Sequence, residues 1–142
     1  MVNAFARCLT LSPQELVDQL GHDGLGMFEG TTIQRTHHVQ EILDVASDMG
    51  VWFTPVELVP QSFDPKTKQA FPIHFGDMSG NFERFQAYLK TSKGVIQGMM
   101  RGQGHAVYWN GHECFDNRGN WSLWREDNEF LPGVYWRALW TT

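Results

Sequence analysis

The chain has 142 residues, a formal net charge of −5, 42% hydrophobic residues and 19% charged residues. A chain of this length fits a single domain, 1–142, that buries most of the surface its unfolded form exposes. The negative charge and the lack of a basic run argue against a nucleic-acid partner. No apolar stretch reaches the roughly 18 residues that a membrane-spanning helix needs.

Two cysteines, Cys8 and Cys114, are too few for a disulfide framework and lack the spacing of a metal site. We therefore expect no metal, no cofactor and a reducing, cytoplasmic location. The first residues lack the charged-then-apolar layout of a signal peptide. Delivery into a host cell is an open alternative, and the sequence leaves the oligomeric state open.

The first part of the chain predicts helices followed by one strand. Ser12-Pro13-Gln14-Glu15 has the form of a helix start, with Ser as the N-cap and Glu as its capping-box partner. Pro55 within the strand indicates an edge strand or a bulge. In chain order we expect a helix over 3–10 with Asn3 as N-cap, a helix from Ser12 to Gly21, a glycine-rich loop over 22–32, a helix from about Val39 that ends at Gly50, and a strand over 51–59.

The second part predicts one further helix and a run of strands. In chain order we expect a long excursion over 60–80 that we interpret as a lid, a helix over 81–90 that starts at an Asn cap and buries Phe82, Phe85 and Leu89, a buried strand over 94–100, a hairpin over 105–116, and a final strand over 133–140. This order predicts an α+β fold in which the N-terminal helices pack on an antiparallel sheet.

The hairpin GQGHAVYWNGHECFDNRG, residues 102–119, carries the chemistry that is easiest to interpret. A two-residue Asn110-Gly111 turn of type I′ would place His105 directly opposite Asp116, with Cβ atoms about 4.5–5.5 Å apart. A carboxylate on one ring nitrogen fixes the tautomer and leaves the other nitrogen as a base. The alternative is a surface pair that contributes a few tenths of a kcal/mol, roughly.

The other histidines favour structural roles. His112 lies about 13 Å along the hairpin from His105 at strand rise, so the two cannot share a metal ion. His37 and His38 begin a helix, where a capping or packing role is expected. His22 and Asp23 could line a cleft, but loop polarity explains them equally well.

GHAVYWNGHECFDNRG resembles the histidine strand and turn of small papain-like cysteine peptidases of the bacterial and phage double-glycine-leader-peptidase type. ELVDQLGHDG and THHVQEILDVA resemble stretches that accompany it. The resemblance implies a papain-like fold, a peptide or protein substrate and a Cys-His-Asp triad. His105 would be the general base and Asp116 its orienting residue. Asn3 and the backbone N–H groups at the start of the first helix would be the oxyanion donors.

The chain departs from this pattern at the nucleophile, where Asn3-Ala4-Phe5 has alanine at the family's cysteine position. Two explanations of Ala4 are open: an engineered replacement of Cys and a natural pseudo-enzyme. A later helix start would instead make Cys8 the nucleophile, and Cys114 is a weaker choice because it lies within the hairpin of the base.

The resemblance therefore predicts a peptidase, an amidase or an acyl transferase that acts on a peptide or isopeptide bond. The alternative is a catalytically inactive module that binds a protein partner. Such a module would use an aromatic groove that includes three tryptophans, Trp121, Trp124 and Trp136.

Overall fold

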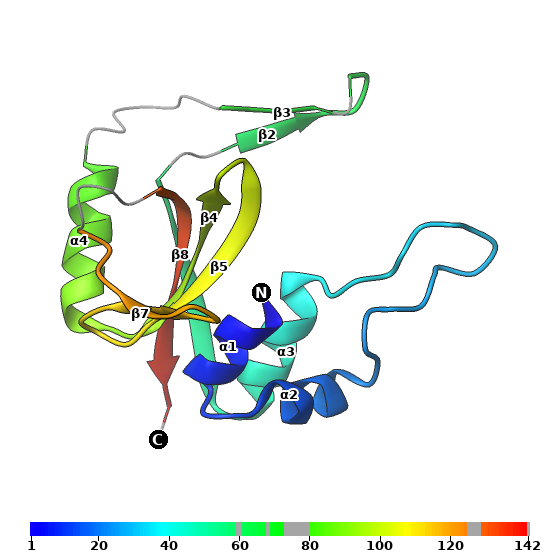
Figure 1. Cartoon of the computed structure of the whole chain (residues 1–142), viewed down its shortest axis with the longest axis horizontal. Helices are drawn as coiled ribbons and strands as arrows, with labels where there is room; N and C mark the ends of the chain where they lie inside the picture. The colour runs from blue at the N-terminus through cyan, green and yellow to red at the C-terminus, as the bar shows by residue number, and fades with distance from the viewer. Residues whose placement is uncertain (59–60, 68, 73–79, 125–128, 142) are drawn as a thin grey trace.

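The computed structural model describes residues 1–58, 61–67, 69–72, 80–124 and 129–141. Figure 1 shows the helices on either side of a central sheet. In chain order the elements are α1 (Val2–Cys8), α2 (Pro13–Leu20), α3 (Val39–Asp48), β1 (Val51–Glu57), β2 (Gln61–Asp64), β3 (Gln69–Pro72), α4 (Asn81–Thr91), β4 (Gly94–Met100), β5 (Gln103–Trp109), β6 (Cys114–Asp116), β7 (Gly119–Trp121) and β8 (Phe130–Trp140).

The sheet has the strand order β1-β8-β4-β5-β6-β7, and each neighbouring pair is antiparallel. Strands β2 and β3 form a separate two-stranded sheet. This arrangement confirms the α+β class. Strand β1 lies at an edge, as Pro55 predicted, and an edge tolerates a residue with no backbone N–H.

Capping explains where α2 begins and ends. Ser12 Oγ accepts a hydrogen bond from the Glu15 backbone N–H at 3.1 Å, and the Glu15 carboxylate accepts one from the Ser12 N–H at 3.3 Å. Gly21 ends the helix with φ of 83°, a left-handed conformation that glycine adopts without strain. The predicted capping box and glycine cap are confirmed.

Two asparagine caps were predicted wrongly. Helix α1 has Met1 as its N-cap, and the Phe5 N–H already bonds to the Met1 carbonyl at 3.2 Å, so Asn3 lies inside the first turn. Gly80 caps α4, and the Asn81 side chain instead donates to the Glu57 carbonyl at 3.2 Å. An asparagine near a helix start does not by itself fix which residue is the cap.

The remaining predicted elements are found with small changes at their ends. Helix α4 buries Phe85 and Leu89 as predicted, whereas the side chain of Phe82 lies outside the described residues. Within the predicted excursion, β2 and β3 form a hairpin. Residues 60, 68 and 73–79 of that excursion lie outside the described part, and the lid interpretation stays a prediction.

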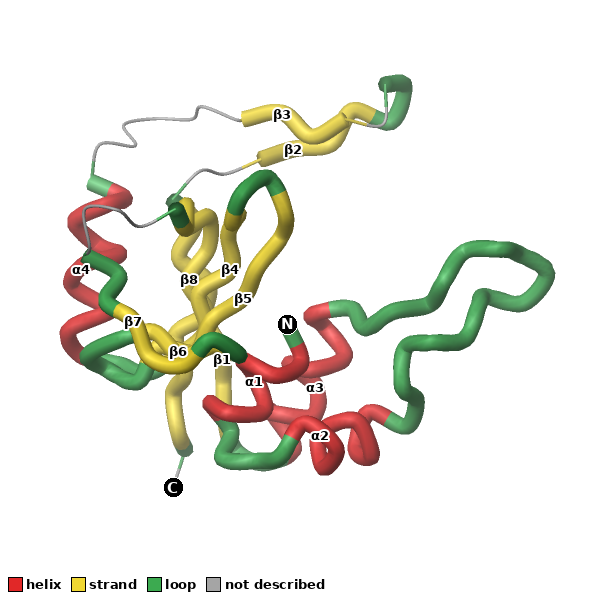
Figure 2. Tube along the Cα trace, in the orientation of Figure 1, coloured by secondary structure: helices red, strands yellow, loops and turns green. Residues whose placement is uncertain are grey.

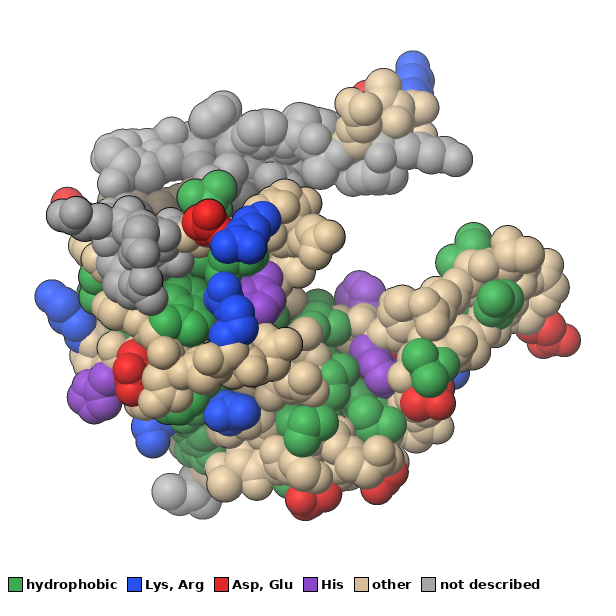
Figure 3. Space-filling view, in the orientation of Figure 1, with side chains coloured by type: hydrophobic (Ala, Val, Ile, Leu, Met, Phe, Trp, Pro, Cys, Tyr) green, Lys and Arg blue, Asp and Glu red, His purple; other side chains and the backbone are tan. Residues whose placement is uncertain are grey.

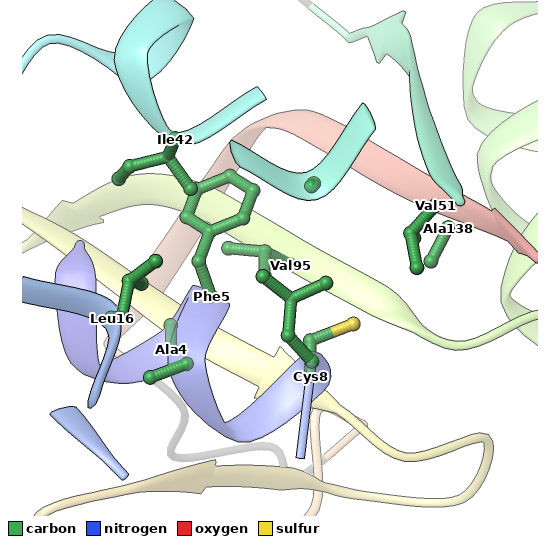
Figure 4. Packing of buried hydrophobic residues seen from close by; sticks show 11 residues of the cluster. Ala4, Phe5, Cys8, Leu16, Ile42, Val51, Val95 and Ala138 are labelled. Atoms are coloured by element: carbon green, nitrogen blue, oxygen red, sulfur yellow. The ribbon is translucent and has the colours of Figure 1, made fainter. Parts of the chain in front are cut away.

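Each face of the sheet packs against its own hydrophobic cluster. On the face that we call the α1 face, Phe5 and Leu16 pack with Ile42 and Val95 (Figure 4). The opposite face, called the α4 face, carries the other cluster. Its buried residues are Phe85, Leu89, Ile96, Val107, Trp109, Cys114, Leu123, Phe130 and Tyr135. Neighbouring residues such as Val95 and Ile96 point to opposite faces, as strand alternation requires.

The predicted loop after α2 is confirmed and extends away from the rest of the chain as an arm (Figure 2). A single isolated bridge, Met27 to Gln34, is its only strand-like pairing among the described residues. Hydrophobic side chains lie exposed along the arm (Figure 3). They belong to Leu25, Met27, Phe28 and Ile33.

Candidate functional site

The hairpin of β5 and β6 has a register two residues away from the predicted one. Tyr108 pairs with Phe115 and Trp109 with Cys114, so the prediction of a two-residue turn was wrong. The Asn110 side-chain oxygen accepts hydrogen bonds from the backbone N–H groups of His112 and Glu113, both at 2.9 Å. This capture of two N–H groups by one side chain favours a longer loop over 110–113.

His105 and Asp116 nevertheless meet, with Nε2 and Oδ2 separated by 2.9 Å. The side-chain direction along a strand has a period of two, so a shift by two residues keeps both side chains on the same face. The pair is now diagonal rather than directly opposed, and diagonal neighbours are still within reach of long side chains. The structure therefore brings the predicted pair together through a different register.

Asp116 is held as a buried carboxylate, with its side chain only 3% exposed. It accepts hydrogen bonds from the Arg118 backbone N–H at 2.8 Å and from two guanidinium nitrogens of Arg118 at 2.9 and 3.2 Å. Burial alone would raise the pKa of this carboxyl. The hydrogen bonds from Arg118 and His105 outweigh burial and hold the pKa of Asp116 well below its usual range. Asp116 is therefore ionised at neutral pH.

The indole N–H of Trp121 also favours the ionised form of Asp116. Its nitrogen is buried and makes no hydrogen bond of acceptable geometry with the described residues. Its effect on Asp116 is thus that of a nearby dipole, weaker than the direct bonds from Arg118.

The contact with Asp116 defines the chemistry of His105. An ionised carboxylate can only accept, so Nε2 of a neutral His105 carries the proton, and Nδ1 is an acceptor that no donor among the described residues occupies. The ring stands edge-on to Phe130 with centroids 6.0 Å apart, and 26% of the side chain is exposed. His105 is therefore an oriented imidazole with one nitrogen available as a base.

A cavity of about 940 Å³ lies between α1 and the strands β4, β5 and β6. Its lining includes four residues to which the sequence assigned roles: Asn3, Ala4, His105 and Asp116. Gly98, Gly104 and Ala106 also line it, and a Cβ placed on Gly104 would meet no atom within 4 Å. The cavity is thus bordered by both the predicted nucleophile position and the base.

Ala4 and the ring of His105 reach this cavity from different sides of the sheet. Ala4 is buried in the cluster on the α1 face, against which Ala106 and Tyr108 also pack. Strand alternation gives His105 the opposite direction from Ala106, and its ring contacts Phe130 of the α4-face cluster. Residue 4 and the ring therefore border a shared space without packing against each other.

Neither cysteine is an activated thiol. Cys8 is buried in the α1-face cluster (Figure 4), and burial, opposed only in part by Lys93, raises its pKa to about 12. Burial and the negative charges of Asp116 and Glu113 raise the pKa of Cys114 to about 12. Neither residue is part of the cavity lining. Raised pKa values and burial are typical of inert thiols.

His37 and His38 have the structural roles that were predicted for them. His38 Nδ1 accepts from the Gln40 N–H at 3.1 Å and caps α3, while His37 stacks on His22 with ring centroids 4.5 Å apart. His22 also bonds to Glu41 at 2.8 Å, and with Asp23 it lines a second cleft of about 590 Å³. No group of three or more metal-binding side chains occurs in the part of the chain that the structure describes.

The three predicted groove tryptophans do not come together. Trp136 packs on the α1 face, Trp121 packs on the α4 face, and Trp124 is exposed. The prediction of an aromatic groove built from all three tryptophans is therefore wrong.

Sequence reasoning missed two residues at the site, Arg118 and Gln97. Arg118 follows Asp116 by two positions, a spacing at which an aspartate commonly accepts from the backbone N–H. Gln97 accepts from the Trp136 indole at 2.7 Å. Its partner is far away in the sequence, so no local pattern could have indicated it.

Comparison with known proteins gives no relative: no family model, no curated protein and no solved structure matches the chain. Among the described residues, no helix has the length and hydrophobicity needed to cross a membrane.

Proposed function

We propose that the cavity is the site of a papain-like cysteine peptidase or amidase in which residue 4 occupies the nucleophile position. Ala4 carries no thiol, so the chain in its present form binds a peptide or protein ligand without cleaving it. The form with Cys at position 4 would hydrolyse an amide bond or transfer its acyl group.

One observation carries this proposal: an oriented histidine, its buried carboxylate partner and residue 4 line the same cavity. Histidine–carboxylate pairs on protein surfaces are common and contribute little. A pair whose carboxylate is almost fully buried, and whose histidine side chain is partly exposed and lines a cavity, is suited to proton transfer.

In the Cys form, Nδ1 of His105 would take the thiol proton through the cavity that both residues border, and the thiolate would attack the carbonyl carbon of the bound amide. As the C–N bond breaks, the imidazolium gives its proton to the leaving amine, which leaves an acyl group on sulfur. Water then attacks this thioester, His105 takes a proton from the water, and the acid and the thiol are released. Asp116 stays ionised throughout and stabilises the imidazolium.

The second candidate function is a binding module that has no catalytic form. Alanine at position 4 and two buried cysteines of raised pKa favour it. The same cavity would then hold the partner, and His105 with Asp116 would serve as polar contacts.

A thiol placed at position 4 distinguishes the cysteine hydrolase from the binding module. Ala4→Cys is compared with Ala87→Cys, a matched alanine replacement at an exposed position of α4. The measurement is the rate of alkylation by iodoacetamide as a function of pH. An ordinary thiol titrates near pH 8.5, roughly, and a thiol paired with an imidazolium titrates well below it.

We expect the thiol at position 4 to have a lower apparent pKa than the thiol of Ala87→Cys. Adding His105→Ala should abolish this difference. Identical pH profiles for the two thiols, unaffected by His105→Ala, would contradict the nucleophile assignment and favour the binding module. Near-identical circular dichroism spectra of all variants serve as the control for folding.

A further inference from the structure

Gln97 lies on β4 and lines the cavity, with its side chain half-buried. It pairs with Ala106 on β5, and both residues follow the alternation that puts Val95 on the α1 face. Its side chain therefore faces the same side of the sheet as residue 4.

The orientation of the Gln97 amide is fixed by Trp136. An indole N–H can only donate, so the atom 2.7 Å from it must be the amide oxygen of Gln97. The NH₂ group is then directed away from Trp136. Trp136 in turn packs against the α1-face cluster, which restricts its own movement.

The Gln97 NH₂ group has no acceptor within the part of the chain that the structure describes. A half-buried donor without an internal partner loses free energy unless water or a ligand supplies an acceptor. The neighbouring positions leave space for one, because Ala106 is small and nothing lies within 4 Å of a Cβ placed on Gly104.

From this geometry we infer that the Gln97 NH₂ group is a fixed hydrogen-bond donor for a carbonyl oxygen of the ligand in this cavity. This inference rests on the proposed function in one respect, namely that the ligand is a peptide. The Gln97 NH₂ group is an uncharged donor, which suits the uncharged carbonyl oxygen of a peptide backbone. It holds a peptide carbonyl on the side of the sheet where residue 4 lies.

The inference is tested on the unaltered chain with a capped tetraglycine peptide, which has backbone carbonyls and no side chains. The measurement is the ¹⁵N NMR signal of the Gln97 side-chain NH₂ during titration. Gln14 and Gln40 provide internal controls, because their NH₂ groups already donate to Asp18 and Asp44, each at 2.8 Å. We expect a saturable change at Gln97 and none at the two controls.

Two variants test the donor and its orientation separately. Gln97→Glu keeps the shape and an oxygen for Trp136 but removes the donor, and we expect at least a tenfold loss of peptide affinity. Trp136→Phe keeps an aromatic ring and removes the indole N–H, so the amide is present but free to turn, and we expect a smaller loss. Unchanged backbone spectra away from the cavity show that both variants are folded.

The absence of a saturable change at Gln97, or an affinity that Gln97→Glu leaves unchanged, overturns the inference. This outcome does not depend on the thiol experiment, because no nucleophile is needed for peptide binding. Conversely, a Gln97-dependent affinity together with an ordinary thiol at position 4 would support the carbonyl site and reject the cysteine hydrolase.

Discussion

Replacement of Asp116 by asparagine tests the buried carboxylate. The variant keeps the shape of the side chain and removes its charge. Asp116 accepts hydrogen bonds from the His105 ring at 2.9 Å and from the Arg118 backbone N–H at 2.8 Å, and its own side chain is 3% exposed. Each hydrogen bond to a charged group stabilises the fold by about 1.5–3 kcal/mol. The amide oxygen of the asparagine still accepts hydrogen bonds, so part of this stabilisation is retained.

We therefore expect Asp116→Asn to lower the free energy of unfolding by about 2–4 kcal/mol at pH 7. The side chain of Arg118 is 52% exposed, so the bonds of its guanidinium add less than about 1 kcal/mol. For a domain of this size the loss corresponds to a decrease in Tm of roughly 6–15 °C. Urea denaturation followed by tryptophan fluorescence gives the free energy directly.

The pH dependence has a defined sign. The pKa of Asp116 is lower in the folded chain than in the unfolded one, where it is about 3.9. The stabilisation is thus fully present above the unfolded pKa and decreases as the pH falls toward the folded pKa. The difference between wild type and Asp116→Asn should shrink as the pH falls below about 4.

Asp18→Asn is the matched control. This exposed carboxylate accepts from Gln14 within α2, so its replacement should change stability by less than about 0.5 kcal/mol. Equal effects of the two replacements, or a difference that stays constant down to pH 2, would refute the account of Asp116 as a charged, buried hydrogen-bond acceptor.

Three further changes test other parts of the structure. Cys8 and Cys114 should react with a thiol reagent only after unfolding, since burial raises the pKa of each to about 12, and rapid reaction in the folded chain would contradict this. Ser12→Ala should cost about 1 kcal/mol in urea denaturation, because it removes the capping bond to Glu15. A Cβ placed on Gly104 meets no atom within 4 Å and the residue lines the cavity, so Gly104→Leu should change stability little, yet it should slow alkylation of a position-4 thiol at least tenfold by filling the cavity.

The sequence predicted the parts of the fold that depend on local patterns. The capping box at Ser12, the glycine that ends α2 and the edge strand with Pro55 are each encoded within a few residues. Strand β7 was not predicted, because Gly119–Trp121 is too short to show an alternating pattern.

The hairpin shows how a wrong detail can leave a correct contact. The sequence does not reveal that the Asn110 side chain captures two backbone N–H groups, so the register was predicted with a turn two residues too short. The contact between His105 and Asp116 survived because a shift of two residues preserves the face of the strand. A shift of one residue would have separated the pair.

The face of the sheet that α1 covers could not be predicted, since it depends on packing between distant segments. This choice has a consequence for the proposed chemistry. Ala4 packs on the α1 face, while the His105 ring contacts Phe130 on the other, so the thiol of a Cys form could exchange its proton with His105 only through the cavity that both border. Gln97 faces the side of residue 4, and Gly104 leaves the space beside it open. A peptide that occupied this space would have its carbonyl held on one face and its leaving amine close to the base on the other. Ligand binding, rather than the hairpin alone, would then complete the arrangement of nucleophile and base.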